Sequence, residues 1–286
     1  MHAHAAAIAG DRAQVEALVA GGVGAHDYTP RPADIRRLAE ADLLVINGAG
    51  METWIEALIP QADNPALKIV DLSEGVPLLP NQSPLDQIEA GEHSDGHAHN
   101  HGHGHSHGHS HGAESEANPH IWLDPVIAMQ QVETLRDALI AADPEGSATY
   151  QRNAEAYLKQ LRTLDAEFRS VLEPLPSKKL ITFHDAFPYL AARYDFDYLG
   201  YVAQFPERDP SPRELAALLD RIRSAGVKVL FAEVGYEPAL LQRIATSTGA
   251  RISVLDTLEV GDGGPEAYLD GMRKNLEALR KAFAAE

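Results

Sequence analysis

The stretch 145–173 constrains the fold most, because it predicts one long amphipathic helix in the middle of the chain. Its apolar residues recur at spacings of three and four, which places them on one helical face; they are Tyr150, Ala154, Tyr157, Leu161, Leu164, Phe168 and Leu172. At 1.5 Å per residue this helix is about 40 Å long. The PLPS sequence that follows ends it. We therefore expect a packed strut that holds its two flanks in a nearly fixed relation.

Strands and helices alternate on both sides of this helix. The first half contains predicted strands at 41–48 and 67–73, and the second half contains strands at 178–184, 199–205, 227–234 and 251–258. Predicted helices lie at 11–20, 33–40, 51–62, 126–141, 211–226, 237–250 and 265–286, with Ser211 as N-cap and Gly226 after the C-terminus of one of them. Such alternation is typical of α/β folds with largely parallel sheets. We predict two α/β lobes, 1–143 and 178–286, joined by one long rigid helix within 144–175.

An insert at 74–117 interrupts the first lobe. It is rich in Gly, Pro, Ser, His and acidic residues, which is typical of a low-complexity segment. Its core, 93–111, contains nine of the fourteen histidines of the chain: His93, His97, His99, His101, His103, His105, His107, His109 and His111. Gly and Ser between them give a mobile backbone, so we interpret the run as an accessory metal collector. A solvated spacer with adventitious metal affinity is the alternative.

The charge of the chain excludes several classes of partner. With 24 basic and 42 acidic residues, the formal net charge is -18. Such a surface repels nucleic acid and anionic membranes and attracts cations. No stretch reaches the roughly 20 apolar residues of a membrane-spanning helix, so we expect no direct membrane insertion. The chain has no cysteine, so thiolate metal sites are excluded.

Three of the five remaining histidines occupy loop or strand-end positions. His26 lies in GAHDYTPRP, His120 in NPHIWLDP, and His184 at the end of the strand in ITFHDAF. Asp256 ends a later strand of the second lobe, and ligands of open α/β sheets bind beyond such carboxyl ends. His2 and His4 stand in a terminal segment without periodicity, for which we expect no functional role. Hydrogen-bonded structural histidines are the alternative for all three loop positions.

If these side chains converge, three imidazoles and one carboxylate form a tetrahedral site that suits zinc. A fourth ligand at Asp256 closes the shell, and a closed shell favours binding over hydrolysis, because catalytic zinc keeps a position for water. Glu233 ends a buried strand and could accept a hydrogen bond from one imidazole. Asp124 and Asp185 flank ligand histidines and are expected to brace their loops.

At this point the motifs carry a resemblance that covers nearly the whole chain. The stretches, in order, are IAGDRAQVEALV, GAHDYTPRPADIRRLAEADLLVINGAGMETW, the His-rich insert, NPHIWLDP, ITFHDAFPYLAARY, VLFAEVGYEP and VLDTL. This order resembles the zinc-binding solute receptors of bacterial metal ABC importers, whose two lobes are joined by a rigid helix. The resemblance implies metal ligands at His26, His120, His184 and Asp256. Manganese and iron receptors of that family usually have Glu at the position of His184, so histidine there favours zinc.

The resemblance also implies a location and partners. Family members usually begin with a signal peptide and a β-strand, whereas MHAHAAA stands here, so we expect a periplasmic protein whose leader was removed or lost by truncation. Some zinc receptors have a Glu beside the first ligand. Ala25 stands at that position here, which favours Asp256 as the fourth metal ligand, with a water molecule as the alternative. We expect a monomer that delivers Zn²⁺, its transported ligand, to an ABC permease and its ATPase subunit.

Three alternatives stay open. One is a manganese or iron receptor of the same family. A second is a cytosolic zinc or nickel storage chaperone that uses the His-rich loop. The third is a zinc hydrolase with Glu233 as its general base, but the chain has no HExxH, P-loop or nucleophile-elbow motif. We therefore expect no enzyme.

Overall fold

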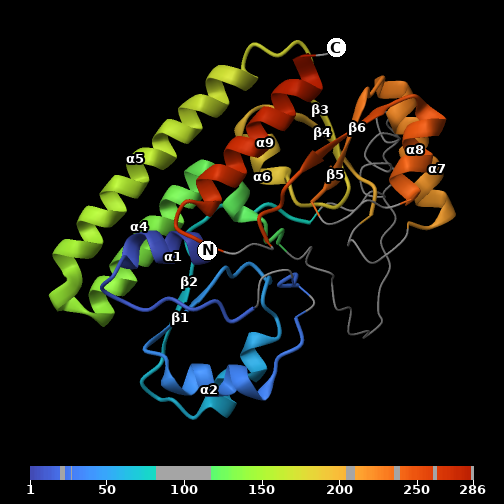
Figure 1. Cartoon of the computed structure of the whole chain (residues 1–286). Helices are drawn as coiled ribbons and strands as arrows, with labels where there is room; N and C mark the ends of the chain where they lie inside the picture. Colours follow the sequence, from blue (N-terminus) through green and yellow to red (C-terminus); the bar gives the residue numbers. More distant parts are fainter. Residues whose placement is uncertain are drawn as a thin grey trace, which may run out of the picture.

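Two parallel sheets with helices around them form the protein in a computed structural model (Figure 1). The structure describes residues 1–19, 23–26, 28–81, 117–203, 210–234, 239–259 and 263–284. The nine histidines predicted to collect metal, together with most of the 74–117 insert, lie outside the described residues. The expected α/β class with parallel sheets is confirmed.

The first sheet contains two parallel strands, β1 (Leu43–Ile46) and β2 (Lys68–Asp71). Helix α2 (Pro32–Glu40) precedes β1, and two short 3₁₀ turns, η1 (Ile55–Ala57) and η2 (Ile59–Ala62), connect the strands. A small apolar core fills the space between these elements; it includes Leu38, Leu44, Ile55, Leu58 and Ala62.

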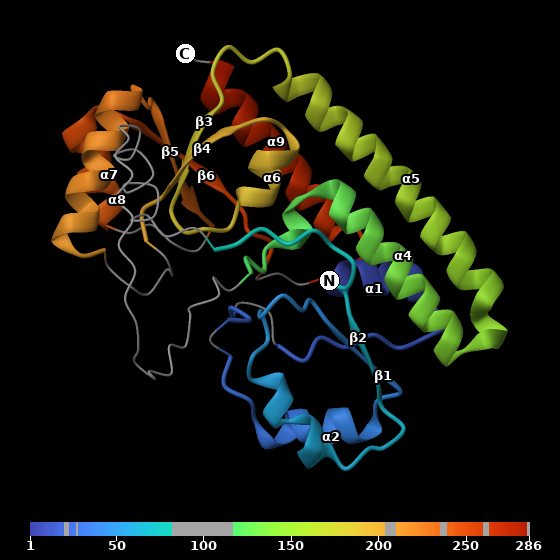
Figure 2. The same ribbon diagram turned by 180° about the vertical axis from the view of Figure 1, so that it is seen from behind.

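The second sheet has four parallel strands in the order β4-β3-β5-β6. They are β3 (Lys179–Thr182), β4 (Asp197–Tyr201), β5 (Val229–Glu233) and β6 (Arg251–Leu255). Helices α7 (Pro212–Ala225) and α8 (Ala239–Thr248) lie on one side, and α6 (Pro188–Arg193) and α9 (Ala267–Ala284) lie toward the long helix (Figures 1 and 2). Helix α7 begins with the predicted Ser211 cap and ends at Gly226, whose φ of 65° is the left-handed conformation glycine adopts easily.

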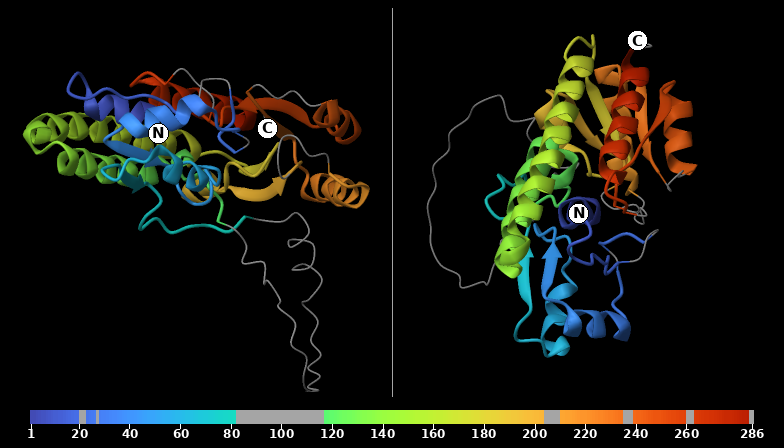
Figure 3. Two further views of the ribbon diagram at one scale, coloured as in Figure 1. Left: turned by 90° about the horizontal axis from the view of Figure 1, so that it is seen from below. Right: turned by 60° about the vertical axis from the view of Figure 1, so that its left-hand side comes forward.

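The long helix predicted between the two halves is α5 (Ser147–Leu172), preceded by η4 (Pro144–Gly146). All seven residues of its apolar stripe are buried. They pack against α1 (His2–Ala9), α4 (Pro125–Ala142) and α9 in the largest apolar core. Figure 3 shows α4 and α5 side by side, running from the first sheet to the second. Helix α4 in turn contacts β1 and β2, and α9 contacts β6, so the long helix is connected to both sheets through these two helices.

Two helix predictions near the N-terminus are wrong. The described part of 11–20 has no helix; the first helix, α1, covers the alanine-rich His2–Ala9 instead and buries Ile8. Alanine has the highest intrinsic helix propensity, and Gly10 ends the helix at a φ of 53°. Over 51–62 two 3₁₀ turns replace the expected α-helix. Pro60 lacks the backbone N–H that a continuing α-helix needs.

His4 has a structural place that its sequence context did not predict. Its ring is completely buried, its Nδ1 lies 3.0 Å from the Tyr157 hydroxyl, and it contacts the edge of the Tyr268 ring. Burial lowers the pKa of His4 well below its ordinary value. His4 is therefore a neutral core residue where α1 meets α5 and α9.

The base of the insert is closed by backbone contacts. The amide of Asn118 donates to the Leu79 carbonyl at 2.8 Å, and Pro80 and Ala117 form an antiparallel bridge. The segment that follows is attached to the second lobe. There Arg193 contacts Asp124 at 2.8 Å, and the Trp122 indole donates to the Thr257 carbonyl at 2.8 Å. No helix in the described part of the chain has the length and apolar character of a membrane span.

Candidate metal centre

Three histidines that are far apart in the sequence meet at one point. The Nε2 atom of His120 lies 3.3 Å from the Nε2 of His26 and 3.1 Å from the Nε2 of His184. His120 and His184 are 3% and 4% exposed, so water reaches this point poorly. Three imidazole nitrogens facing one another make a ready set of metal ligands.

The carboxylate beside these imidazoles is Glu259. Its Oε1 lies 3.3 Å from His120 Nε2 and 3.8 Å from His184 Nε2. The ligand atoms of His26, His120 and Glu259 all lie within 4.8 Å of one another. In sequence, Glu259 follows the end of β6 by four residues, so the loop after this strand supplies the acidic group.

Asp256, the expected fourth ligand, has a different place in the structure. Its Oδ1 accepts a hydrogen bond from the Leu258 amide at 2.9 Å, and its own amide donates to Asn275 Oδ1 at 2.7 Å. Asp256 thus closes the turn that carries Glu259 toward the histidines. Among the described residues, the structure groups Glu259 rather than the expected Asp256 with the histidines.

Each histidine is placed by a different kind of local structure. His184 lies two residues beyond β3, at the carboxyl end of the sheet, as the parallel topology predicts. His120 stands immediately before η3 (Ile121–Leu123), whose residues are all buried. His26 lies in a loop held by Trp54, whose indole donates to the Ala25 carbonyl at 2.9 Å. Trp54 therefore fixes this loop.

Carboxylate and amide groups orient two of the rings from behind. His184 Nδ1 lies 2.5 Å from Glu233 Oε2, and the His184 amide donates to Glu233 Oε1 at 2.8 Å. The predicted acceptor at the end of β5 is therefore in contact with His184. His120 Nδ1 lies 3.0 Å from Asn118 Oδ1. In both rings Nδ1 is occupied by protein, which leaves Nε2 for an ion.

Burial and charge set the protonation of these groups. Burial lowers the pKa of His120 to about 4, despite the opposing effect of Glu259, so this ring is neutral at pH 7. Burial also acts to lower the pKa of His184, but the hydrogen bond and charge of Glu233 outweigh it and raise that pKa. Burial acts to raise the pKa of Glu259, whereas its contact with His120 and the neighbouring imidazoles lower it overall. A neutral imidazole beside an ionised carboxylate is the state that binds a cation.

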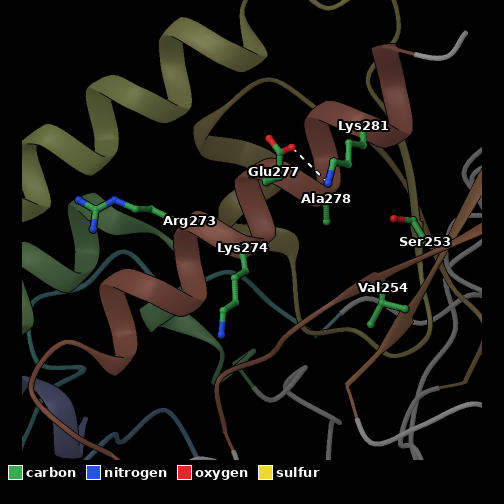
Figure 4. A pocket seen from close by; sticks show the side chains of 7 residues that line it. All are labelled: Ser253, Val254, Arg273, Lys274, Glu277, Ala278 and Lys281. Atoms are coloured by element: carbon green, nitrogen blue, oxygen red, sulfur yellow. Dashed lines mark ion pairs between the residues drawn. The ribbon is translucent and has the colours of Figure 1, made fainter.

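The chemistry of this cluster differs from that of a surface hollow elsewhere. A hollow of about 570 Å³ lies between β6 and α9 (Figure 4). Its lining includes Arg273, Lys274 and Lys281, and Lys281 pairs with Glu277 at 3.3 Å. Three cationic side chains repel a metal ion, so this hollow is unsuited to one.

Sequence reasoning missed Glu259 and Asn118. The prediction stopped at the strand end, where Asp256 stands, although the sequence LDTLE places a second carboxylate three residues later. Asn118 lies two residues before His120 in NPH, and its short polar side chain was a signal for a loop contact with the ring.

Comparisons with known proteins agree on one family. The family model described as "Zinc-uptake complex component A periplasmic" matches residues 1–282. The zinc-binding lipoprotein AdcA of Streptococcus pneumoniae is 32% identical over 98% of this chain, which spans only 53% of AdcA. The high-affinity zinc uptake system protein ZnuA of Bacillus subtilis is 31% identical over 96% of this chain and 82% of its own length. The chain thus spans about half the length of the first of these relatives.

A solved structure supports the fold and widens the range of metals. The solute-binding protein FpvC of Pseudomonas aeruginosa, in complex with Mn²⁺, superposes with a TM-score of 0.83 at 27% identity, covering 99% of this chain and 95% of its own. The relatives of the chain are thus named for different metals, zinc in some cases and iron or manganese in others, and FpvC has been solved with Mn²⁺ and with Ni²⁺.

Proposed function

The chain belongs to the periplasmic zinc-uptake component A family, and from that premise we propose that it is a high-affinity receptor for Zn²⁺. The ion is held by His26, His120, His184 and Glu259. The receptor captures zinc outside the cytoplasmic membrane, as a monomer in the periplasm, and delivers it to an ABC permease with its ATPase subunit. Metal is the cargo of this protein and undergoes no reaction in it.

The observation that carries this proposal is the meeting of three Nε2 atoms and one carboxylate oxygen at a buried point. Four of the distances between these atoms are 3.1–3.8 Å, which suits ligands that each approach an ion at the roughly 2.0–2.2 Å typical of zinc. His26, His120 and Glu259 form the group within 4.8 Å, and His184 adjoins it through His120 and Glu259. The four groups come from four separate loops. Since the protein scaffold orients at least two of the rings, the ion meets a nearly formed site.

The ligand chemistry supports zinc over manganese. Imidazole nitrogens suit zinc, whereas manganese prefers carboxylates, carbonyls and water. With three imidazoles and one carboxylate, the site offers mostly nitrogen. The manganese or iron alternative therefore needs a ligand set richer in oxygen than the one present among the described residues.

A hydrolytic role is disfavoured by the contacts of Glu233. Both of its oxygens are engaged with His184, one with the ring and one with the backbone amide. A general base has to reach a water bound at the metal. The relatives, too, are named for metal binding and uptake rather than catalysis.

The deciding experiment separates the cluster from the His-rich run. Because Leu79, Pro80 and Ala117 close the base of the insert, residues 82–116 can be replaced by a short Gly-Ser linker; we call this the loop-replaced variant. Competition titration against a zinc chelator should give one tight Zn²⁺ per chain in this variant. The same variant with His26→Ala, His120→Ala and His184→Ala should lose it.

Three outcomes discriminate the alternatives. If the triple substitution leaves tight binding intact, the proposed site is wrong. If the loop-replaced variant alone loses nearly all binding, storage by the His-rich loop is the better explanation. If one tight site remains but Mn²⁺ displaces Zn²⁺ at equal concentration, the protein is a manganese receptor built on a histidine-rich site.

A further inference from the structure

Asn118 is buried completely and has a hydrogen-bonding partner for every polar atom of its side chain. Its Oδ1 lies 3.0 Å from the backbone N–H of His120 and 3.0 Å from the ring Nδ1 of the same residue. Its Nδ2 donates to the backbone carbonyl of Asp185 at 2.6 Å and to Asp185 Oδ2 at 3.2 Å. The amide thus joins two loops that are 67 residues apart in the sequence.

The orientation of this amide follows from backbone groups alone. A backbone N–H only donates, so the Asn118 atom that faces the His120 amide has to be the oxygen. A backbone carbonyl only accepts, so the atom that faces Asp185 has to be the nitrogen. The two assignments agree, and neither depends on where hydrogens are placed on the imidazole.

The fixed oxygen then determines the tautomer of His120. Because Oδ1 accepts, Nδ1 has to carry the hydrogen of the neutral ring, and the lone pair is left on Nε2. Nε2 is the atom that faces His26, His184 and Glu259. A ring with the opposite tautomer would point an N–H at the ion.

The other end of the amide is anchored next to His184. Asp185 Oδ1 accepts a hydrogen bond from the Tyr198 hydroxyl at 2.9 Å, and the Thr182 hydroxyl donates to the His184 carbonyl at 2.7 Å. Tyr189 donates to the Asn118 carbonyl at 2.7 Å. Asn118 is thus held from both its backbone and its side chain.

We infer that Asn118 is a positioning residue for the metal: its amide fixes the tautomer of His120 and locks that ring in register with the loop of His184. This inference rests on the proposed function, because it gives Asn118 a part in positioning two of the proposed metal ligands, His120 and His184. Asn118 contacts the His120 ring directly and the loop of His184 through Asp185, and it is not itself one of the proposed ligands.

The test uses Co²⁺ as a spectroscopic substitute for zinc in the full chain, at one equivalent per chain, and again in the loop-replaced variant. Asn118→Ala should weaken zinc binding by about 10–100-fold, the range typical of lost outer partners of metal ligands. It should also change the visible Co²⁺ absorption, which reports the ligand geometry. Asn118→Asp keeps an oxygen toward the His120 ring but turns its other oxygen toward the Asp185 carbonyl and carboxylate. Only the His120 half of the contact is then kept, so the Co²⁺ spectrum should lie between those of wild type and Asn118→Ala.

A matched control separates positioning from folding. Asn153→Ala removes an amide of the same kind, which donates to the Ile8 carbonyl at 3.0 Å between α5 and α1 and not in the cluster, so it should lower the melting temperature without changing the Co²⁺ spectrum. The inference is overturned if Asn118→Ala binds zinc and absorbs like wild type, because the amide then positions neither the His120 ring nor the His184 loop. If the wild-type spectrum survives the triple histidine substitution, the proposed function fails, and this inference with it.

Discussion

Replacing one carboxylate in the β6–α9 loop tests the proposed ligand set directly. Glu259→Gln keeps the size of the side chain and a carbonyl oxygen but removes the negative charge beside the imidazoles. The matched variant is Asp256→Asn, which keeps an oxygen that can accept from the Leu258 amide. If Glu259 is the ligand, the first change weakens zinc binding strongly and the second does so weakly.

The expected magnitude follows from the charges. Two unit charges 4 Å apart interact by about 4 kcal/mol at an effective dielectric constant of 20, so a carboxylate beside a divalent ion contributes about 8 kcal/mol. Desolvation of the buried charges offsets several kcal/mol of this. We therefore expect Glu259→Gln to cost about 3 kcal/mol, which is roughly a 100-fold increase in the dissociation constant. Asp256→Asn should change it by less than about threefold, which is under 0.7 kcal/mol.

Chelator competition in the loop-replaced variant measures both constants without interference from the histidine run. Circular dichroism and thermal melting confirm that both variants are folded. A larger loss in Asp256→Asn than in Glu259→Gln refutes the proposed set and restores Asp256 as the fourth ligand. Equal and small losses in both indicate a water in the fourth position.

Three further predictions follow from buried groups. Glu233→Gln replaces the carboxylate that accepts from His184 Nδ1 with an amide that can present N–H groups instead. Zinc affinity should fall by about 10–100-fold in the same titration, and an unchanged affinity contradicts the role of Glu233 in orienting the His184 ring. Burial lowers the pKa of His4 in the folded protein, so the unfolded chain binds more protons below about pH 6.5. The free energy of unfolding should therefore fall as the pH is lowered through that value, by at most about 1.4 kcal/mol per pH unit. Denaturant melts of His4→Phe should show a smaller dependence on pH, and an identical dependence argues against this role of His4. Phe168→Ala should lower the free energy of unfolding by about 3–5 kcal/mol because the ring is fully buried. Arg162→Ala, at an exposed position of the same helix, should change it by less than about 0.5 kcal/mol. Similar losses in both variants would contradict the packing of α5.

Periodicity was enough to predict the long helix, because burial of one face imposes a regular spacing on the sequence. The strands of the described residues were predicted instead from short apolar runs, such as that of β5, which is buried along its whole length. Periodicity failed over 11–20 and 51–62, where amphipathic spacing was present but tertiary packing and Pro60 decided the outcome. The boundaries of the two lobes stay a prediction, and so does the collector role of the 93–111 run.

The three histidines of the site and Glu233 were predictable from the sequence, because they stand at strand ends or in loops where ligands of α/β sheets bind. His184 stands where parallel topology brings ligands, and its acceptor Glu233 ends a neighbouring strand of the same sheet. The choice between Asp256 and Glu259 depended on how one turn folds, since Asp256 is used to close it. A local backbone contact of this kind has no periodic signature, so the sequence could not separate the two carboxylates.

The attachment of the segment after the insert has a consequence for how the ion is shared between the lobes. In chain order His120 precedes α5 and belongs to the first half, but Asn118, Trp122 and Asp124 bind it to the second. The same segment is also held to the first sheet, because Asn47, directly after β1, donates to the Pro119 carbonyl at 2.8 Å. The short stretch 118–124 therefore bridges the two sheets, and it carries one of the proposed metal ligands, His120, on that bridge.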